Sequence, residues 1–264
     1  MSISLYHRFV YLFICILSVS VILGCGESKF EYTISSKLNP HKIAPLTAEL
    51  QIVSELPCKA TIKVLGETPI EQSFDVLSDS LTIPVIGLYP NKINKVLVTL
   101  NYDGGTVIDT VNIKTKPTPV GFPRIEINKL ERSNMETGLH GCDIHFANFG
   151  KFNSIPIIFD DQGIVRWYLD FSFTNEMTAP FQRLKDGTIL VVTRHEIFEF
   201  DMLGKVVKQT QIDQNYGMHH DVIELPDGNL LICVGKRDAF IEIDGETVQS
   251  DSDFIILFDR KTKK

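Results

Sequence analysis

The sequence predicts an all-β protein in which a small β-sandwich is followed by the first blades of a β-propeller. Short apolar runs with period-two alternation, bounded by Gly, Pro, Asn and Asp, continue along most of the chain. Two motif pairs also recur at one offset of 41 residues: Lys185-Asp-Gly with Pro226-Asp-Gly, and Phe159-Asp with Phe200-Asp. All-β units that repeat every 40–50 residues or so are typical of propeller blades.

Residues 1–24 have the layout of a secretory signal peptide. Arg8 precedes a mostly apolar stretch at 9–23, and Leu23-Gly24-Cys25 resembles the lipobox of a bacterial lipoprotein. An ordinary signal peptide or a single membrane anchor is the alternative, but the stretch is short for a bilayer span of about 20 residues. We therefore expect an exported chain, lipid-anchored to the bacterial membrane through Cys25, in the periplasm or at the cell surface.

The composition is that of a globular protein. The 264 residues are 44% hydrophobic and 22% charged, which fits one large or two ordinary domains with a sizeable core. The net charge is −7, and it becomes −8 without residues 1–24, whose one charged residue is Arg8. This acidic balance argues against a general nucleic-acid-binding protein.

The cysteines indicate neither a metal centre nor a disulfide framework. Cys15 leaves with the signal peptide and Cys25 is the lipidation site, so Cys58, Cys142 and Cys233 remain. Their spacing does not match a metal site, and they can form at most one disulfide. Cys233 is expected to be a buried free thiol within a strand. We expect no metal and no cofactor.

The mature chain begins, at residues 25–116, with the predicted sandwich of about 90 residues. Its apolar runs alternate at period two, and turn residues such as Asp103-Gly104-Gly105 separate them. The expected strands are 47–53, 61–65, 81–86, 93–102 and 106–113. No pattern in this part indicates catalysis, so we expect it to pack on the part that follows or to act as a spacer for it.

A proline-rich joint at 117–123 separates the sandwich from the predicted partial propeller at 124–264. The first segment of the propeller part, 139–146, contains His140 and His145. We expect it to be a strand whose partners the pattern does not identify.

Two repeat units follow, and a third begins at Asp253 after an insert at 238–252. Arg166-Trp167, in the first unit, is expected to pack between blades, because Trp is a large apolar body with one donor. The sequence stops in the next turn, whereas a propeller closes a ring of about 4–8 blades. We therefore expect the chain to be a fragment of a longer protein.

Two successive hairpins are expected to bring basic side chains to one edge of the molecule. In a hairpin, the start of the first strand and the end of the second lie together. The first hairpin ends in Arg194-His195, and the second begins with His219-His220 and ends in Lys236-Arg237. These residues are the candidates for a binding site.

Each candidate also has a structural interpretation. His220 could cap backbone groups, and His219 would point the opposite way if the segment is extended. Arg194 and His195 could lie in a solvated loop or pair with Glu196. Lys236-Arg237 could attract anionic substrates or remain a solvated charged loop.

Taken together, the motifs resemble those of bacterial arylsulfate sulfotransferases that need no nucleotide sulfate donor. The resemblance covers the chain from about Tyr32 to its end. It is carried by Leu88-Tyr-Pro-Asn-Lys-Ile-Asn, Gly163-Ile-Val-Arg-Trp-Tyr-Leu-Asp, Phe181-Gln-Arg-Leu-Lys-Asp-Gly and His219-His-Asp-Val-Ile-Glu-Leu-Pro-Asp-Gly-Asn. It implies an Ig-like sandwich before a six-bladed propeller, and transfer of a sulfuryl group from an aryl sulfate donor to a phenolic acceptor through a sulfated histidine.

The resemblance implies that His220 is the first funnel histidine, which holds the sulfate and is not the nucleophile. The nucleophilic histidine is expected beyond residue 264, so no catalytic residue is assigned within the chain. The sulfate-binding candidates are His220, Arg194, His195 and His219. One alternative is a non-catalytic, surface-anchored sandwich and propeller that binds anions. A quinone-dependent dehydrogenase, which needs a metal site and stacking tryptophans, fits poorly with the single Trp167. The sequence predicts neither the donor and acceptor nor an oligomeric state.

Overall fold

The computed structural model describes residues 30–122, 124–136, 138–149, 152–174, 176, 178 and 181–263. The predicted signal peptide and Cys25 lie outside these residues. The chain divides into two compact units, Met1–Glu31 and Tyr32–Lys264, and the strands of the described residues lie in the second. In the described part, one 3-10 turn, η1 (Arg132–Asn134), is the extent of helical structure, and no helix there has the length and apolar character to cross a membrane. The all-β prediction is confirmed.

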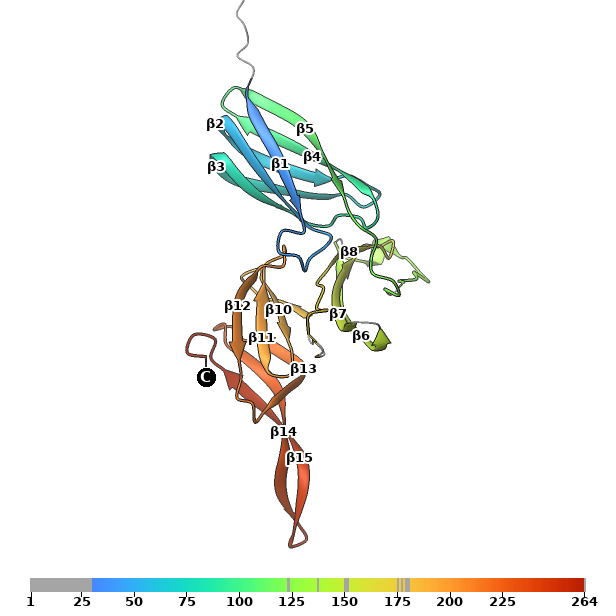
Figure 1. Ribbon diagram of the computed structural model, residues 1–264, viewed down its shortest axis with the longest axis vertical. Helices are drawn as coiled ribbons and strands as arrows, with labels where there is room; N and C mark the ends of the chain where they lie inside the picture. The colour runs from blue at the N-terminus through green and yellow to red at the C-terminus, as the bar shows by residue number, and fades with distance from the viewer. Residues whose placement is uncertain are drawn as a thin grey trace, which may run out of the picture. The chain divides into compact units, whose positions relative to one another are not determined.

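Five strands form the N-terminal sheet (Figure 1). They are β1 (Tyr32–Leu38), β2 (Ala48–Val64), β3 (Ile70–Val85), β4 (Ile93–Tyr102) and β5 (Gly105–Lys114). The first half of β2 pairs with β1 and the second half with β4, while β3 pairs along both halves, all antiparallel. One long strand therefore serves both layers of the sandwich.

The long strand β2 replaces two predicted strands, 47–53 and 61–65. Its pairing with β3 shifts register between Val53 and Cys58 and again between Cys58 and Ala60. Pro57 lies in this interval and has no N–H to donate to the ladder. The alternation breaks at such a bulge, which is why the sequence pattern shows two short strands.

Three antiparallel sheets follow within the described residues. The first contains β6 (His140–Phe149), β7 (Phe152–Phe159) and β8 (Val165–Tyr168). The second contains β9 (Phe181–Arg183), β10 (Ile189–Val192), β11 (Glu196–Phe200) and β12 (Val206–Gln211), and the third β13 (Gly217–Glu224), β14 (Leu230–Ile243) and β15 (Glu246–Phe258).

The predicted division into two complete units and a third that begins at Asp253 is wrong, because the described residues contain three sheets with other bounds. The segment 139–146 opens the first sheet, since β6 pairs with β7. Asp253 lies inside β15, the third strand of the last sheet, and does not start a new unit. The predicted insert at 238–252 continues β14 and β15 as a two-stranded ribbon that projects from the sheet (Figure 1).

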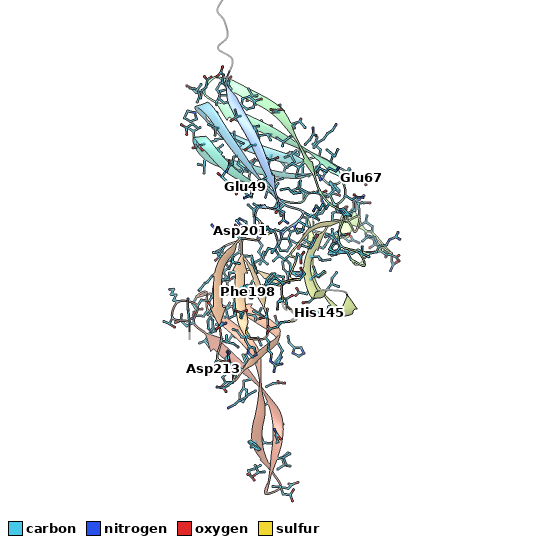
Figure 2. All side chains as sticks on the ribbon, in the orientation of Figure 1. Glu49, Glu67, His145, Phe198, Asp201 and Asp213 are labelled. Atoms are coloured by element: carbon cyan, nitrogen blue, oxygen red, sulfur yellow. The ribbon has the colours of Figure 1, made fainter. Side chains whose placement is uncertain are left out.

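The repeat of 41 residues reflects a turn that occurs in successive sheets. Asp160 O accepts the N–H of Gly163 after β7, and Asp201 O accepts the N–H of Gly204 after β11. Figure 2 labels Asp201 at the end of its sheet. The two glycines have φ of 74° and 84°, in the left-handed region that favours glycine. The repeated aspartate and glycine are therefore required by the turn.

An aromatic core joins the first and second propeller sheets at Trp167. Its Nε1 donates to Met202 O at 2.7 Å, and its ring centroid lies 5.8 Å from that of Phe181. The buried members of this core are Ala44, Trp167, Leu169, Phe171, Ile189, Val191, Phe198 and Phe200. The packing of Trp167 between blades is confirmed.

Arg166 does not share this environment, which corrects the prediction for the Arg-Trp pair. Adjacent side chains of a strand point to opposite faces, and Arg166 is directed toward the sandwich. There it donates to Gly87 O and Thr68 O at 2.6–2.9 Å. Arg166 therefore attaches the first propeller sheet to the sandwich.

Candidate functional site

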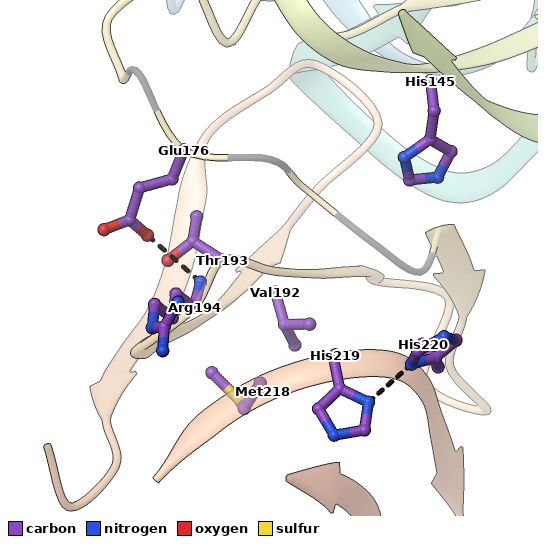
Figure 3. Close-up of a pocket in the computed structure, with 8 residues that line it drawn as sticks. All are labelled: His145, Glu176, Val192, Thr193, Arg194, Met218, His219 and His220. Carbon is purple, nitrogen blue, oxygen red and sulfur yellow. Dashed lines mark hydrogen bonds between the residues drawn. The ribbon is translucent and has the colours of Figure 1, made fainter. Parts of the chain in front are cut away.

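A pocket of about 660 Å³ lies where strands of the propeller sheets end (Figure 3). Three imidazoles and one guanidinium contribute to its walls. The lining residues are His145, Glu176, Val192, Thr193, Arg194, Met218, His219 and His220. They come from β6, from the end of β10 and the loop that precedes β9, and from β13. The described residues thus supply a pocket with several N–H donors and a partly apolar wall.

Backbone contacts hold the end of β10 beside the start of β13. Met218 N donates to Arg194 O at 2.7 Å, and Arg194 N donates to Glu176 Oε2 at 3.1 Å. A Cβ built at Gly217 would come within 3.0 Å of Arg194 Nε, so glycine leaves room for the guanidinium to lie on β13. Arg194 lines the pocket with its guanidinium beside β13.

His219 and His220 sit on a bulge and interact with each other. The pairing of β13 with β14 shifts register between Met218 and Val222, and His220 has a φ of 59°. The two rings are perpendicular, with centroids 4.7 Å apart, and their Nδ1 atoms lie 2.5 Å apart. The two side chains were expected to point opposite ways only if the segment is extended, and the bulge means that this condition is not met.

His195 is separated from this pocket. Its Nδ1 lies 3.0 Å from Tyr216 O, so its ring holds the loop before β13. Glu196, considered as an ion-pair partner for this loop, instead accepts hydrogen bonds from Gln209 and Gln211. Arg194, His219 and His220 are thus brought together, and His195 is placed in a structural contact.

A smaller pocket of about 210 Å³ adjoins the first and contains Lys236. Arg194, Met218 and His219 line both pockets. Asp253 on β15 also lines the smaller one, and its Oδ1 lies 3.2 Å from His219 Nε2. Lys236 therefore lies close to the candidate residues, whereas the side chain of Arg237 is outside the described part of the structure.

The sequence pattern missed three residues of this region: His145, Glu176 and Asp253. His145 belongs to the 139–146 segment, whose pairing partner could not be read from alternation alone. On the same strand, burial raises the pKa of Asp143, although a hydrogen bond from Phe181 N and the nearby His145 act in the opposite direction. The carboxylate of Asp143 therefore lies in a poorly solvated place next to the pocket wall.

The donor set of the pocket is suited to an anion. Arg presents five N–H donors in a fixed fork, and an imidazole presents one or two. Among the described residues, no group of three or more His, Cys, Asp or Glu is placed to hold a metal ion. Cys58 is buried, and Cys142 and Cys233 are partly buried; all three are free thiols. The prediction of a free thiol in a strand at Cys233 is confirmed, although the side chain is not fully buried.

Comparisons with known proteins match both parts of the chain. Residues 125–264 match the family described as Arylsulfotransferase (ASST), and residues 35–116 match the Arylsulfotransferase Ig-like domain. The predicted boundaries 25–116, 117–123 and 124–264 stay a prediction. The arylsulfate sulfotransferase AssT of Escherichia coli O6:H1 strain CFT073 is 25% identical over 276 residues, and the AssT of Lelliottia amnigena is 28% identical over 278. Each alignment covers 84% of this chain and 46% of the relative, so the chain spans about half the length of these curated relatives.

Proposed function

Because the chain belongs to the arylsulfotransferase family, we propose that its pocket binds the sulfate group of an aryl sulfate. The whole protein would then transfer the sulfuryl group to a phenolic acceptor. The observation that carries the proposal is the convergence of Arg194, His219 and His220 on one pocket.

The chemistry of the pocket supports an aryl sulfate as ligand. A sulfuryl group in transfer spreads negative charge over its oxygens, and positioned Arg and His donors stabilise such charge. Val192 and Met218 supply an apolar wall against which an aromatic ring can pack. We propose that transfer proceeds through a sulfated histidine, since imidazole is a good neutral nucleophile near pH 7. Arg194 is given the role of holding the sulfuryl group, with His219 and His220 beside it, and none of the three is assigned as the nucleophile.

Replacing Arg194 by alanine is expected to weaken binding of 4-nitrophenyl sulfate about 10- to 100-fold, because a hydrogen bond to a charged group contributes about 1.5–3 kcal/mol. Isothermal titration calorimetry measures this affinity. The matched control is Arg183→Ala, which removes an exposed arginine on β9 outside the pocket lining and should leave the affinity unchanged.

Release of 4-nitrophenol in the presence of phenol tests turnover in the same samples. Binding without release would favour the non-catalytic binding protein for this chain. If wild-type protein binds no aryl sulfate, or if Arg183→Ala weakens binding as much as Arg194→Ala, the pocket is not the sulfate site.

We also propose that the chain is exported and anchored to the membrane by a lipid on Cys25. The support is the sequence of residues 1–25 alone, in which an apolar stretch ends in Leu-Gly-Cys. Cys25→Ala should abolish incorporation of radiolabelled palmitate and release the protein from the membrane fraction, whereas Cys15→Ala should change neither. Labelling that persists in Cys25→Ala would place the lipid elsewhere or exclude the anchor.

A further inference from the structure

We propose that Asp253 is a positioning residue for the pocket. Acting through His219, it holds His220 in the tautomer whose Nε2 is unprotonated and available as a base. The inference rests on the proposed function, in which a phenolic acceptor loses its proton as the sulfuryl group arrives.

The surroundings of His219 Nε2 determine where the proton of this ring lies. This atom is buried, and Asp253 Oδ1 is 3.2 Å away. The ring N–H is not aligned with that oxygen, so the contact is an electrostatic pair and not a regular hydrogen bond. A nitrogen lone pair at this distance from a carboxylate would be repelled. The proton of His219 therefore resides on Nε2.

The proton position on His219 determines the proton position on the neighbouring ring of His220. A neutral His219 with its proton on Nε2 has a lone pair on Nδ1. His219 Nδ1 and His220 Nδ1 are 2.5 Å apart, which requires one proton between the two nitrogens. That proton must come from His220 Nδ1. His220 Nε2 then carries a lone pair on the wall of the larger pocket.

The backbone of the third propeller sheet places these groups in contact. Asp253 on β15 is directly opposite Gly235 on β14, and Gly235 is opposite Gly217 on β13. A Cβ built at Gly235 would lie 3.4 Å from His219 Nε2 and 3.5 Å from Asp253 Oδ1, so no larger side chain separates them. His220 keeps a left-handed φ of 59°, a conformation costly for most non-glycine residues and often found at functional sites.

This arrangement defines a proton-transfer step. As the phenolic oxygen forms its bond to sulfur, its proton moves to His220 Nε2 and the O–H electron pair stays on oxygen. The bond between sulfur and the donor atom breaks, and its electron pair remains on that atom. His220 is then cationic, its Nε2–H can donate to a sulfuryl oxygen, and the carboxylate of Asp253 stabilises the charge through His219.

The contact sets proton positions more than it stabilises the fold. The side chain of Asp253 is 81% exposed, and ion pairs in such positions add little to the free energy of unfolding. Asp253→Ala should therefore leave the thermal midpoint unchanged and alter only the tautomers of the His219 and His220 rings. If the role of Asp253 were purely structural, Asp253→Ala would lower the thermal midpoint and leave the tautomers of His219 and His220 unchanged.

Nuclear magnetic resonance of protein with 15N-labelled histidine rings tests the proposal. Wild-type protein should show His219 protonated on Nε2 and His220 protonated on Nδ1, with the exposed His41 as the reference ring. Asp253→Ala and Asp253→Asn should both lose this pattern, because each removes the negative charge that acts on His219 Nε2. Glu246→Ala removes one negative charge from the tip of the same hairpin and should leave both rings unchanged. A wild-type His220 protonated on Nε2, or the same pattern in Asp253→Ala, would overturn the proposal.

Titration of the same samples with 4-nitrophenyl sulfate separates the two ideas. If the tautomers are as expected but the ligand neither binds nor shifts the His219 and His220 signals, the proposed function fails while the positioning by Asp253 stands. If the ligand binds but the tautomers do not depend on Asp253, the positioning role fails and the proposed function stands.

Discussion

Replacing Arg166 by methionine is expected to lower the free energy of unfolding by about 3–5 kcal/mol, the range found when one partner of a buried ion pair is removed. Methionine keeps much of the length of the side chain but removes every N–H. Asp160 would then be a buried charge without its counter-ion, since both side chains are 0% exposed.

The contacts of Arg166 explain why so much depends on one side chain. Its Nη1 donates to Asp160 Oδ2 at 2.9 Å and to Thr68 O at 2.8 Å, while Nε and Nη2 both donate to Gly87 O. Its Cζ lies 3.7 Å from the ring centroid of Tyr89, a cation–π contact. One guanidinium thus satisfies a carboxylate and two carbonyls from different parts of the chain.

Urea unfolding followed by the fluorescence of Trp167 measures the effect, because the single tryptophan is the next residue and is buried. Arg132→Met is the control: Arg132 pairs with Asp161 at 2.8 Å but its side chain is 64% exposed, so little change is expected. The double variant Arg166→Met with Asp160→Asn should recover part of the loss. Equal stabilities of Arg166→Met and Arg132→Met would show that the buried pair contributes little.

The strand content was predictable because a strand with one buried face leaves a local alternating pattern. That pattern identified most of β4 and β5, and the aspartate-to-glycine turns gave the repeat length. The pairing of strands was harder to predict from the sequence, because it depends on residues that are distant along the chain. Arg166 contacts Gly87 and Thr68 of the sandwich, and nothing in its local sequence distinguishes this from a contact between blades.

In the candidate site too, features that follow from local patterns were predictable, and features that depend on distant residues were not. Hairpin geometry correctly grouped Arg194 with His219 and His220, since it follows from two turns that the sequence marks clearly. Hairpin geometry did not predict the bulge that turns His219 and His220 toward each other, because a register shift depends on both strands of the pair. The contact of Asp253 with His219 was not predictable from the sequence either, because it results from the pairing of β14 with β15.

The second large effect is expected at Arg260, where replacement by methionine should lower the free energy of unfolding by about 2–4 kcal/mol. Arg260 follows β15, and its side chain is 15% exposed. Its Nη2 and Nε donate to the two carboxylate oxygens of Glu199 on β11, at 2.6 and 3.1 Å. This geometry is the bidentate arrangement in which Arg–carboxylate pairs are strongest.

Arg260 also serves the third sheet, so its loss would affect both sheets. Its Nη1 lies 3.2 Å from Glu224 Oε1 and 3.3 Å from Gly228 O. The hydrogen bonds to Glu199, together with nearby carboxylates, raise the pKa of Arg260, and the side chain stays charged at any pH at which the protein is folded. Methionine would leave Glu199 and Glu224 without the guanidinium that contacts both. Their side chains are only 6% and 8% exposed, so water would solvate the two carboxylates poorly.

Variants of neighbouring residues separate this network from a general loss of charge near the end of β15. Lys261→Met removes an exposed cation one residue away and is expected to leave the urea midpoint unchanged. Glu199→Gln added to Arg260→Met removes a buried carboxylate that would keep only Lys208, at 3.9 Å, as a cationic partner, and should restore part of the stability. Because Arg260 is partly exposed and Arg166 is not, the loss at Arg260 should be the smaller of the two. A larger loss at Arg260, or no recovery with Glu199→Gln, would mean that desolvation of unpaired carboxylates does not control the stability of these sheets.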